Sequence, residues 1–442
     1  MQTNFRPEQL VDPHMKSSER ILRSCVHCGF CTATCPTYVL LGDELDSPRG
    51  RIYLMKEMLE SGKPATPEVV KHIDRCLSCL ACMTTCPSGV HYMHLVDHGR
   101  AYIEATYTRP WHDRLMRALI AHVLPHRERF RAALTLARLT RPLAPLLRHL
   151  PFVGKRLGAM LDLAPRATLP QAEMPNLKPT SERKGRVALL SGCAQPVLAP
   201  HINAAAIRVL TRRGVEVVLP PGEGCCGALV HHMGRETEAL AFARRNIDAW
   251  TAEIERGLDA IVITASGCGT TIKDYGFMFR DDPAYAAKAA RVSRLTKDIC
   301  EYLATQTIAP TRPTGQVVAY HSACSMQHGQ QISIEPKVLL RQAGFTVKDV
   351  PEGHICCGSA GTYNLLQPEL AARLRDRKVA NIATTGAAII ATGNIGCITQ
   401  IGSASEIPIV HTIELVDWAT GGPLPRGLEA PAQLRTPAEA RA

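Results

Sequence analysis

Eight of the seventeen cysteines fall in two short runs that share one spacing. Each run reads C-x2-C-x2-C-x3-C and is followed by proline; the first spans residues 25–36 and the second spans residues 76–87. Thiolates at steps of three residues can wrap a tight turn around one iron–sulfur cubane, and this spacing is typical of [4Fe–4S] sites. The chemistry that these residues predict is therefore one-electron transfer.

The fourth cysteine of each run is better placed for the neighbouring cluster, and this exchange is the rule in bacterial two-cluster ferredoxins. The first [4Fe–4S] cluster is therefore assigned to Cys25, Cys28, Cys31 and Cys86. The second is assigned to Cys76, Cys79, Cys82 and Cys35. A pair of zinc sites is the alternative, but structural zinc typically uses separated C-x2-C pairs or cysteine mixed with histidine.

The remaining cysteines, apart from Cys300, form an internal repeat with offsets of 129 to 131 residues. The first unit contains Cys193, Cys225, Cys226 and Cys268, and the second contains Cys324, Cys356, Cys357 and Cys397. Each unit reads strand, cysteine loop, helix, strand, Cys-Cys-Gly (CCG) turn, long helix, strand and Gly-Cys turn. This alternation predicts parallel sheets covered by helices.

In parallel sheets, ligands bind beyond the carboxyl ends of the strands. Because every repeated cysteine follows a strand, we expect the four thiols of each CCG unit to converge on one site. The neighbouring glycines permit tight turns and close approach to an inorganic group. A further iron–sulfur cluster, a zinc ion and a plain apolar core remain open for each unit, whereas Cys300 lies in an apolar helical pattern and is expected in the core.

The chain has 442 residues, of which 45% are hydrophobic and 21% charged, the usual balance of a globular protein with several domains. No apolar run is long enough to span a membrane as a helix. The first twenty residues lack the apolar segment of a secretory signal, so none is expected. Aromatic residues make up only 5%, and the absence of a basic, aromatic-bearing face argues against a nucleic-acid partner.

Most of the net charge of +11 lies between residues 109 and 166, where twelve Lys and Arg stand against three Asp and Glu. Leu, Ala and Arg recur there with helical period, and prolines divide the segment into short helices. A cationic amphipathic segment can lie on an anionic membrane surface or dock against an acidic partner. A linker that packs its leucines on its own domains is the other interpretation.

These patterns predict an α/β protein. Residues 1–107 are expected to form a small, α-rich ferredoxin-type domain with two clusters, its halves separated by a helical insert, and residues 108–185 a basic helical connector. Residues 186–310 and 311–419 are the two CCG units with mainly parallel sheets. Residues 420–442 are expected to be a disordered tail.

The order of two cluster-binding runs and two CCG units resembles the iron–sulfur subunits of flavin-dependent hydroxyacid oxidases, above all those that act on glycolate. The resemblance extends from about Ile21 to Trp418. It is carried by CVHCGFCTATCPTYVLLGDELDSPRGRIYLMKE, CMTTCPSGVHY, GCAQPVLAPHINAA, TASGCGTTIKDYG and CCGSAGTYNLLQPELA. Subunits of L-lactate oxidation and of anaerobic glycerol-3-phosphate dehydrogenase share this architecture, so they are the alternative complexes.

The resemblance implies an oxidoreductase complex that acts on CH–OH groups. A partner flavoprotein carrying FAD would oxidise glycolate to glyoxylate, accompanied by a second flavin-domain subunit. This chain, which has neither a flavin motif nor a hydroxyacid pocket, would contribute no catalytic residue to that step. It would relay electrons toward quinone or another acceptor, as a cytoplasmic protein peripheral to the inner membrane.

One departure separates the chain from CCG units of heterodisulfide reductase type, which end in a C-x-x-C pair. Thr271 and Gln400 stand where the second cysteine of that pair would be. The alternative of another class, a thiol–disulfide reductase that uses the CCG cysteines, is therefore disfavoured.

Overall fold

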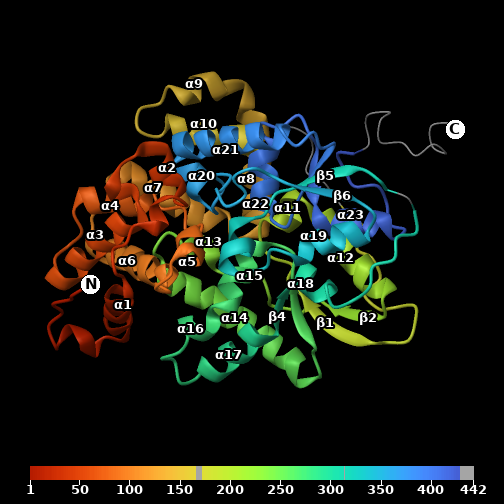
Figure 1. Cartoon of the computed structure of the whole chain (residues 1–442), viewed down its shortest axis with the longest axis horizontal. Coiled ribbons are helices and arrows are strands. Elements are labelled where there is room, and N and C mark those ends of the chain that lie inside the picture. Colours follow the sequence, from red (N-terminus) through yellow and green to blue (C-terminus); the bar gives the residue numbers. More distant parts are fainter. Residues whose placement is uncertain (166–171, 313, 429–442) are drawn as a thin grey trace.

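The computed structural model describes residues 1–165, 172–312 and 314–428 of the chain. A helical N-terminal part lies beside a C-terminal half built on two small sheets, and connector helices form one edge of the molecule (Figure 1). This is the α/β architecture that the sequence predicts. Residues 429–442 of the tail expected to be disordered lie outside the described residues, whereas Leu428 is buried in the core of the C-terminal half.

Six helices build the N-terminal part, and the sequence explains where they start. Four of them begin with proline, whose fixed φ suits the first helical position. Asp12, Ser47 and Thr66 each accept a hydrogen bond from a backbone N–H group in the first turn of the helix that follows. The helices are α1 (Pro13–Ser24), α2 (Pro36–Leu41), α3 (Pro48–Ser61), α4 (Pro67–Asp74), α5 (Ala81–Thr85) and α6 (Tyr92–Thr106). The insert expected between the cysteine runs is α3.

The described residues of the connector contain four α-helices: α7 (Trp111–Val123), α8 (Arg127–Thr140), α9 (Ala144–Arg148) and α10 (Gly154–Leu163). Buried ion pairs link the first residues of the connector to the N-terminal part. Arg109 and Arg117 lie 2.7 and 2.9 Å from the carboxylate of Asp74. Leucines on α8 and α9 remain exposed, with Leu139 at 70%. The connector therefore packs on its own domain at one end and presents an apolar, basic surface at the other.

Two four-stranded sheets, all of whose neighbouring strands are parallel, follow the connector. The first has the order β2-β1-β3-β4 and the second the matching order β6-β5-β7-β8. The strands of the first are β1 (Gly185–Leu189), β2 (Val215–Val218), β3 (Ala260–Ile263) and β4 (Thr296–Asp298). Those of the second are β5 (Val317–Tyr320), β6 (Thr346–Asp349), β7 (Ile389–Thr392) and β8 (Ile409–His411). The internal repeat is thus a repeat of the fold.

Helices cover both sheets, and α12 and α23 pack against each other between the units in a shared apolar core. The first unit contains α11 (Gln195–Leu198), α12 (Pro200–Arg212), α13 (Ala228–His231), α14 (Glu236–Glu255), α15 (Ser266–Lys273), α16 (Tyr275–Met278), α17 (Ala286–Leu295) and α18 (Ile299–Leu303). The second contains α19 (Glu335–Gln342), α20 (Tyr363–Leu366), α21 (Pro368–Ala383), α22 (Ile395–Gly402) and α23 (Thr412–Ala419). Cys300, expected in the core, is buried there.

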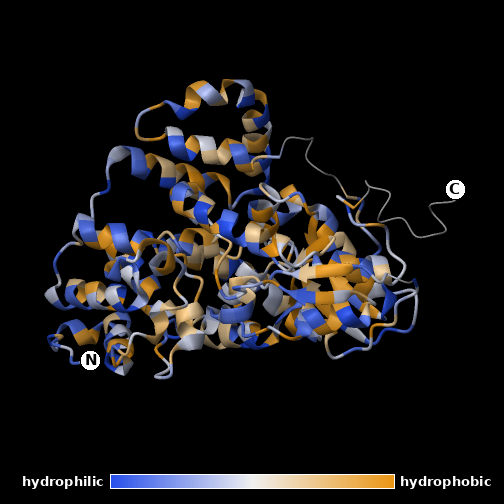
Figure 2. Ribbon diagram, turned by 45° about the horizontal axis from the view of Figure 1, so that its top comes forward, coloured by the Kyte–Doolittle hydropathy of each residue, from blue (hydrophilic) through white to orange (hydrophobic). Residues whose placement is uncertain are grey.

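Hydrophobic residues concentrate on the strands, while the connector helices alternate between hydrophobic and hydrophilic positions (Figure 2). Among the described residues, no helix has both the length and the apolar content needed to cross a membrane.

Candidate metal centres

The thiols assigned to the first cluster line one small cavity of about 30 Å³. Cys25 ends α1, Cys31 lies in a 3₁₀ turn (Phe30–Thr32), and Cys86 ends α5. The structure thus brings the fourth cysteine of the second run to the first three of the first run, and Cys82 lines the same cavity. The crossed assignment therefore stays a prediction. Cys28, the other member of this set, is exposed, so the group lies at the protein surface.

The second set is buried deeper. Cys35, Cys76 and Cys79 are buried, and Cys82 interacts electrostatically with all three. Burial raises the pKa of Cys79 and of Cys82 well above the usual value for a thiol. Buried thiols of this kind become thiolates only when a positive group compensates the charge, and a bound iron cluster supplies that compensation.

Polar side chains contact the same sulfur atoms. The Arg51 guanidinium donates to Cys35 Sγ at 3.8 Å, and the Tyr92 hydroxyl donates to Cys76 Sγ at 3.7 Å. Arg51 also binds the buried carboxylate of Asp46, which His72 contacts at 3.0 Å. His72 therefore has a carboxylate partner rather than a cluster, consistent with a supporting role around the ligands.

In the first CCG unit, each cysteine follows a strand of the parallel sheet. Cys193 follows β1, Cys225 and Cys226 follow β2, and Cys268 lies in α15 after β3. Cys193 donates a hydrogen bond to Cys225, and this bond together with burial raises the pKa of Cys193 well above its usual value. Cys226 interacts in the same way with Cys268, so the four thiols meet, as the position of each after a strand predicts.

The second unit repeats this arrangement. The Cys324 thiol donates to Cys356 at 3.7 Å, and the Cys357 thiol donates to Cys397 at 3.6 Å. The ring of His321, a residue not predicted from the sequence, lies beside these sulfur atoms. Its signal was available in the repeat, because His321 stands where the first unit has Leu190.

The glycine of each CCG motif permits a tight turn of the backbone, as the sequence predicts. Gly227 and Gly358 have φ of +86° and +88°, a region that favours glycine. A Cβ atom would lie 2.9 Å from the carbonyl oxygen of Ala239 at Gly227, and 2.5 Å from that of Ala371 at Gly358. The close approach found here is to the following long helix, α14 or α21.

The ferredoxin-type and CCG cysteines meet directly. Cys79 and Cys356 belong to one buried cluster, with Cys324 packed against it. The hydroxyl of Thr84 is 2.7 Å from Nδ1 of His328, in a π-helical turn (Ser325–Gly329) that follows Cys324. The second cluster set therefore adjoins the second CCG unit.

A cavity of about 540 Å³ lies between the connector and both CCG units. Apolar side chains of α7, α8 and α10 line one side, including Phe130, Leu134 and Leu157. Seven of the eight repeated cysteines line the other: Cys193, Cys226, Cys268, Cys324, Cys356, Cys357 and Cys397. The two groups of thiols thus share one apolar chamber.

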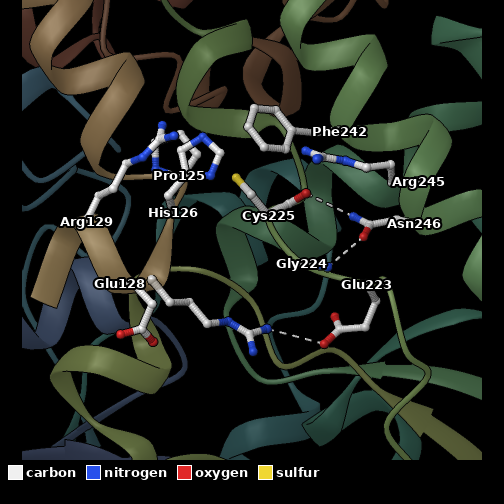
Figure 3. A pocket seen from close by; sticks show the side chains of 12 residues that line it. Pro125, His126, Glu128, Arg129, Glu223, Gly224, Cys225, Phe242, Arg245 and Asn246 are labelled. Carbon is white, nitrogen blue, oxygen red and sulfur yellow. Dashed lines mark hydrogen bonds and ion pairs between the residues drawn. The ribbon is translucent and has the colours of Figure 1, made fainter.

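Cys225, the eighth, lines a separate pocket, shown in Figure 3. The side chain of Asn246 in α14 binds the loop that carries Cys225. It accepts a hydrogen bond from the Gly224 N–H at 2.9 Å and donates one to the Cys225 carbonyl at 3.0 Å. Arg127 of α8 reaches Glu223 at 3.3 Å. The connector is therefore tied to the loop that carries the CCG turn.

The fold and the cysteine groups define a class: an iron–sulfur protein in which a dicluster domain is joined to a pair of cysteine-rich units. Residues 21–90 match the 4Fe-4S dicluster domain family, and residues 187–273 and 318–402 match the cysteine-rich CCG domain family.

Curated relatives narrow this class. The chain is 44% identical to the glycolate oxidase iron-sulfur subunit of Escherichia coli K12, over 95% of this chain and 99% of that one. It is 32% identical to the probable glycolate oxidase iron-sulfur subunit of Bacillus subtilis 168, over 92% and 96%. The chain belongs to the family of glycolate oxidase iron–sulfur subunits.

More distant similarities are consistent with this family. Lactate utilization protein A of Bacillus velezensis is 27% identical over 52% of this chain and 99% of its own. A crystal structure of a hypothetical protein from Helicobacter pylori covers 94% of this chain and 74% of that chain, with a TM-score of 0.52 and 9% identity. The latter supports the fold alone.

Proposed function

We propose that this chain relays electrons within a glycolate-oxidising complex, from an FAD-containing flavoprotein toward a quinone. The observation that carries the proposal is the continuous series of cysteine groups. It begins at exposed Cys28, passes through the buried second set, and reaches the second CCG unit where Cys79 packs with Cys356.

The expected ligands are the two crossed sets, Cys25, Cys28, Cys31 with Cys86, and Cys76, Cys79, Cys82 with Cys35. When bound there, [4Fe–4S] clusters supply one-electron steps between a two-electron donor and a two-electron acceptor. The protein's own part is to hold the sulfur atoms close together and to exclude water, and the burial of Cys76 and Cys79 supports that role.

Side chains around the first set offer a docking surface for the flavoprotein. Val26 and Phe30, on either side of Cys28, are 67% and 64% exposed. Covering them with a partner subunit would remove apolar surface from water and bring a donor next to the outermost thiols. We expect a second flavin-domain subunit in the same complex.

The chamber beneath the connector suits a lipid-soluble acceptor. Its apolar side accommodates a quinone ring or its isoprenoid tail, and its thiol-lined side would hold any metal group of the CCG units. Exposed leucines and arginines of α8 and α9 fit the surface of an anionic membrane, so we expect a peripheral position at its cytoplasmic face. The overall reaction balances as glycolate plus quinone giving glyoxylate plus hydroquinone, with two electrons and two protons transferred.

Quinone reduction by the complex tests the proposal. The complex with its flavoprotein partner should reduce a quinone with glycolate, whereas the flavoprotein alone should become reduced by glycolate and stop there. Turnover with L-lactate or glycerol 3-phosphate, and none with glycolate, would assign the chain to the related complexes instead. Glycolate-driven quinone reduction by the flavoprotein without this chain would contradict the relay.

A further inference from the structure

His321 is the least explained polar side chain near the cysteine groups. It is 1% exposed, and neither ring nitrogen has a hydrogen-bond partner within the part of the chain that the structure describes. A ring nitrogen of His321 and the sulfur atoms of Cys357 and Cys397 all lie within 4.8 Å of one another. A buried imidazole without partners is costly unless something at this place binds it.

An ordinary buried histidine in the same unit behaves differently. His411 is fully buried, yet its Nε2 lies 2.8 Å from the Thr264 carbonyl and its Nδ1 accepts from the Ile413 N–H at 3.1 Å. His411 is thus satisfied by protein atoms alone. His321 meets two thiols instead, and thiols with imidazole are the donors that thiophilic metals prefer.

The first unit shows that the fold does not need a histidine here. The Leu190 N–H donates to the Val262 carbonyl and the His321 N–H donates to the Ala391 carbonyl, so the two residues occupy equivalent backbone positions directly after β1 and β5. Leucine fills this position in the first unit with 3% exposure. An apolar side chain therefore fits this position, so packing alone does not require a histidine there.

The second unit lacks the second thiol of a C-x-x-C pair, and an imidazole could supply a metal ligand in its place. Gln400 stands where a C-x-x-C pair would have its second cysteine, and its side chain is turned to other partners: it accepts from Asn364 and donates to the Ala371 carbonyl. The unit is left with four thiols and His321.

We propose that His321 is a metal ligand, so that the second CCG unit binds its metal through mixed thiolate and imidazole donors and the first unit through thiolates only. The metal is a thiophilic one, either iron within an iron–sulfur group or zinc(II). This proposal concerns binding and stands independently of the electron relay.

Metal content and spectroscopy of the full chain, purified without oxygen, test the assignment. The variant His321→Leu copies the residue of the first unit and should keep the fold, which its thermal unfolding temperature checks. We expect it to lose the metal of the second unit, seen as a drop in iron or in zinc per chain, while the iron of the ferredoxin-type domain stays. The control Leu190→Met should change neither value.

The second measurement depends on which metal the unit binds. For iron, the wild-type protein should show nitrogen hyperfine coupling in the electron paramagnetic resonance (EPR) of a CCG centre, and His321→Leu should lack it. For zinc, X-ray absorption should find nitrogen together with sulfur in the wild type. His321→Cys, which restores a donor, should recover the metal with an all-sulfur signature. Unchanged metal content and spectra in His321→Leu, or no metal in the second unit of the wild type, would overturn the proposal.

Discussion

The two CCG units have the same strand order, the same cysteine positions and the same left-handed glycine, but different side chains around their thiols. Leu190 and Asn246 in the first unit correspond to His321 and Lys378 in the second. Lys378 follows Ala371 by seven residues, as Asn246 follows Ala239. At these two positions the first unit has neutral side chains, and the second has an imidazole and a buried amine.

The neighbours of the two units differ as well. Cys79 of the second cluster set packs against the second unit, whereas the first unit meets the ferredoxin-type domain where His94 lies 2.8 Å from Asp274. Arg127 of the connector pairs with Glu223 of the first unit, and Lys155 of the connector pairs with Glu369 of the second. Lys378 is 1% exposed and donates to the Glu352 carbonyl at 2.8 Å, with the thiols of Cys356 and Cys357 close enough to interact with its charge. The two units therefore share one scaffold but differ in the side chains around their thiols.

The largest effect should come from breaking the junction between the domains. Cys79→Ser removes an expected ligand of the second cluster set, and we expect glycolate-driven quinone reduction to fall at least about 100-fold. Mutating a residue that only hydrogen-bonds to a metal ligand already lowers activity by up to about 100-fold. Reduction of the flavin by glycolate should stay intact. Cys225→Ser, in the unit away from this junction, should cost less; an equal loss would remove the distinction between the units.

A second test compares the two glycines. Gly358→Ala adds a Cβ at 2.5 Å from a backbone oxygen in the left-handed region, and Gly227→Ala adds one at 2.9 Å. We expect Gly358→Ala to lower the free energy of unfolding by about 3 kcal/mol and Gly227→Ala by about 2 kcal/mol. Denaturant unfolding of both variants measures this, and a neutral effect at either position would contradict the packing of its CCG turn.

A third test concerns the chamber that the units share. Leu134→Trp places a larger ring among its lining residues, and the KM for quinone should rise about tenfold, equivalent to about 1.4 kcal/mol. Reduction of a water-soluble dye should be unaffected. Leu139→Trp, at an exposed position outside the chamber lining, is the control. Equal KM values in both variants would place the quinone elsewhere.

The smallest expected effect is electrostatic. Lys378→Asn copies the first unit and removes a positive charge beside the thiols, which disfavours the reduced, more negative state. The reduction potential of a redox centre in the second unit should fall on the order of 60 mV, the equivalent of about 1.4 kcal/mol for one electron. Lys155→Asn, at an exposed position, should leave the potential in place. A rise after Lys378→Asn would contradict this sign.

Local patterns predicted most of the architecture. Strand and helix periodicity, together with the register of the CCG repeat, predicted the parallel sheets and the meeting of thiols beyond their strands, because each thiol position depends on its own strand. Cys86 lies beside the first run, but Cys82 lines the same cavity, so the division of the ligands between the two clusters stays a prediction.

Other features depend on segments far apart in the sequence. His321 and Lys378 lie beside the thiols only after β5 and α21 pack around the CCG turn, and the chamber exists only because the connector covers both units. The approach of Gly358 to Ala371 is another such feature, because the sequence does not show which helix residue faces the turn. The sequence does hold a signal for His321, because this residue stands where the first repeat has Leu190.

The most direct test of the account follows the electrons. The anaerobic complex is mixed with glycolate and frozen at short times, and EPR of this chain's iron–sulfur signals is recorded before and after a quinone is added. We predict that glycolate produces reduced-cluster signals and that quinone removes them, at rates no slower than turnover. Reduced flavin with unchanged cluster signals, or clusters that quinone fails to reoxidise while turnover proceeds, would contradict the relay.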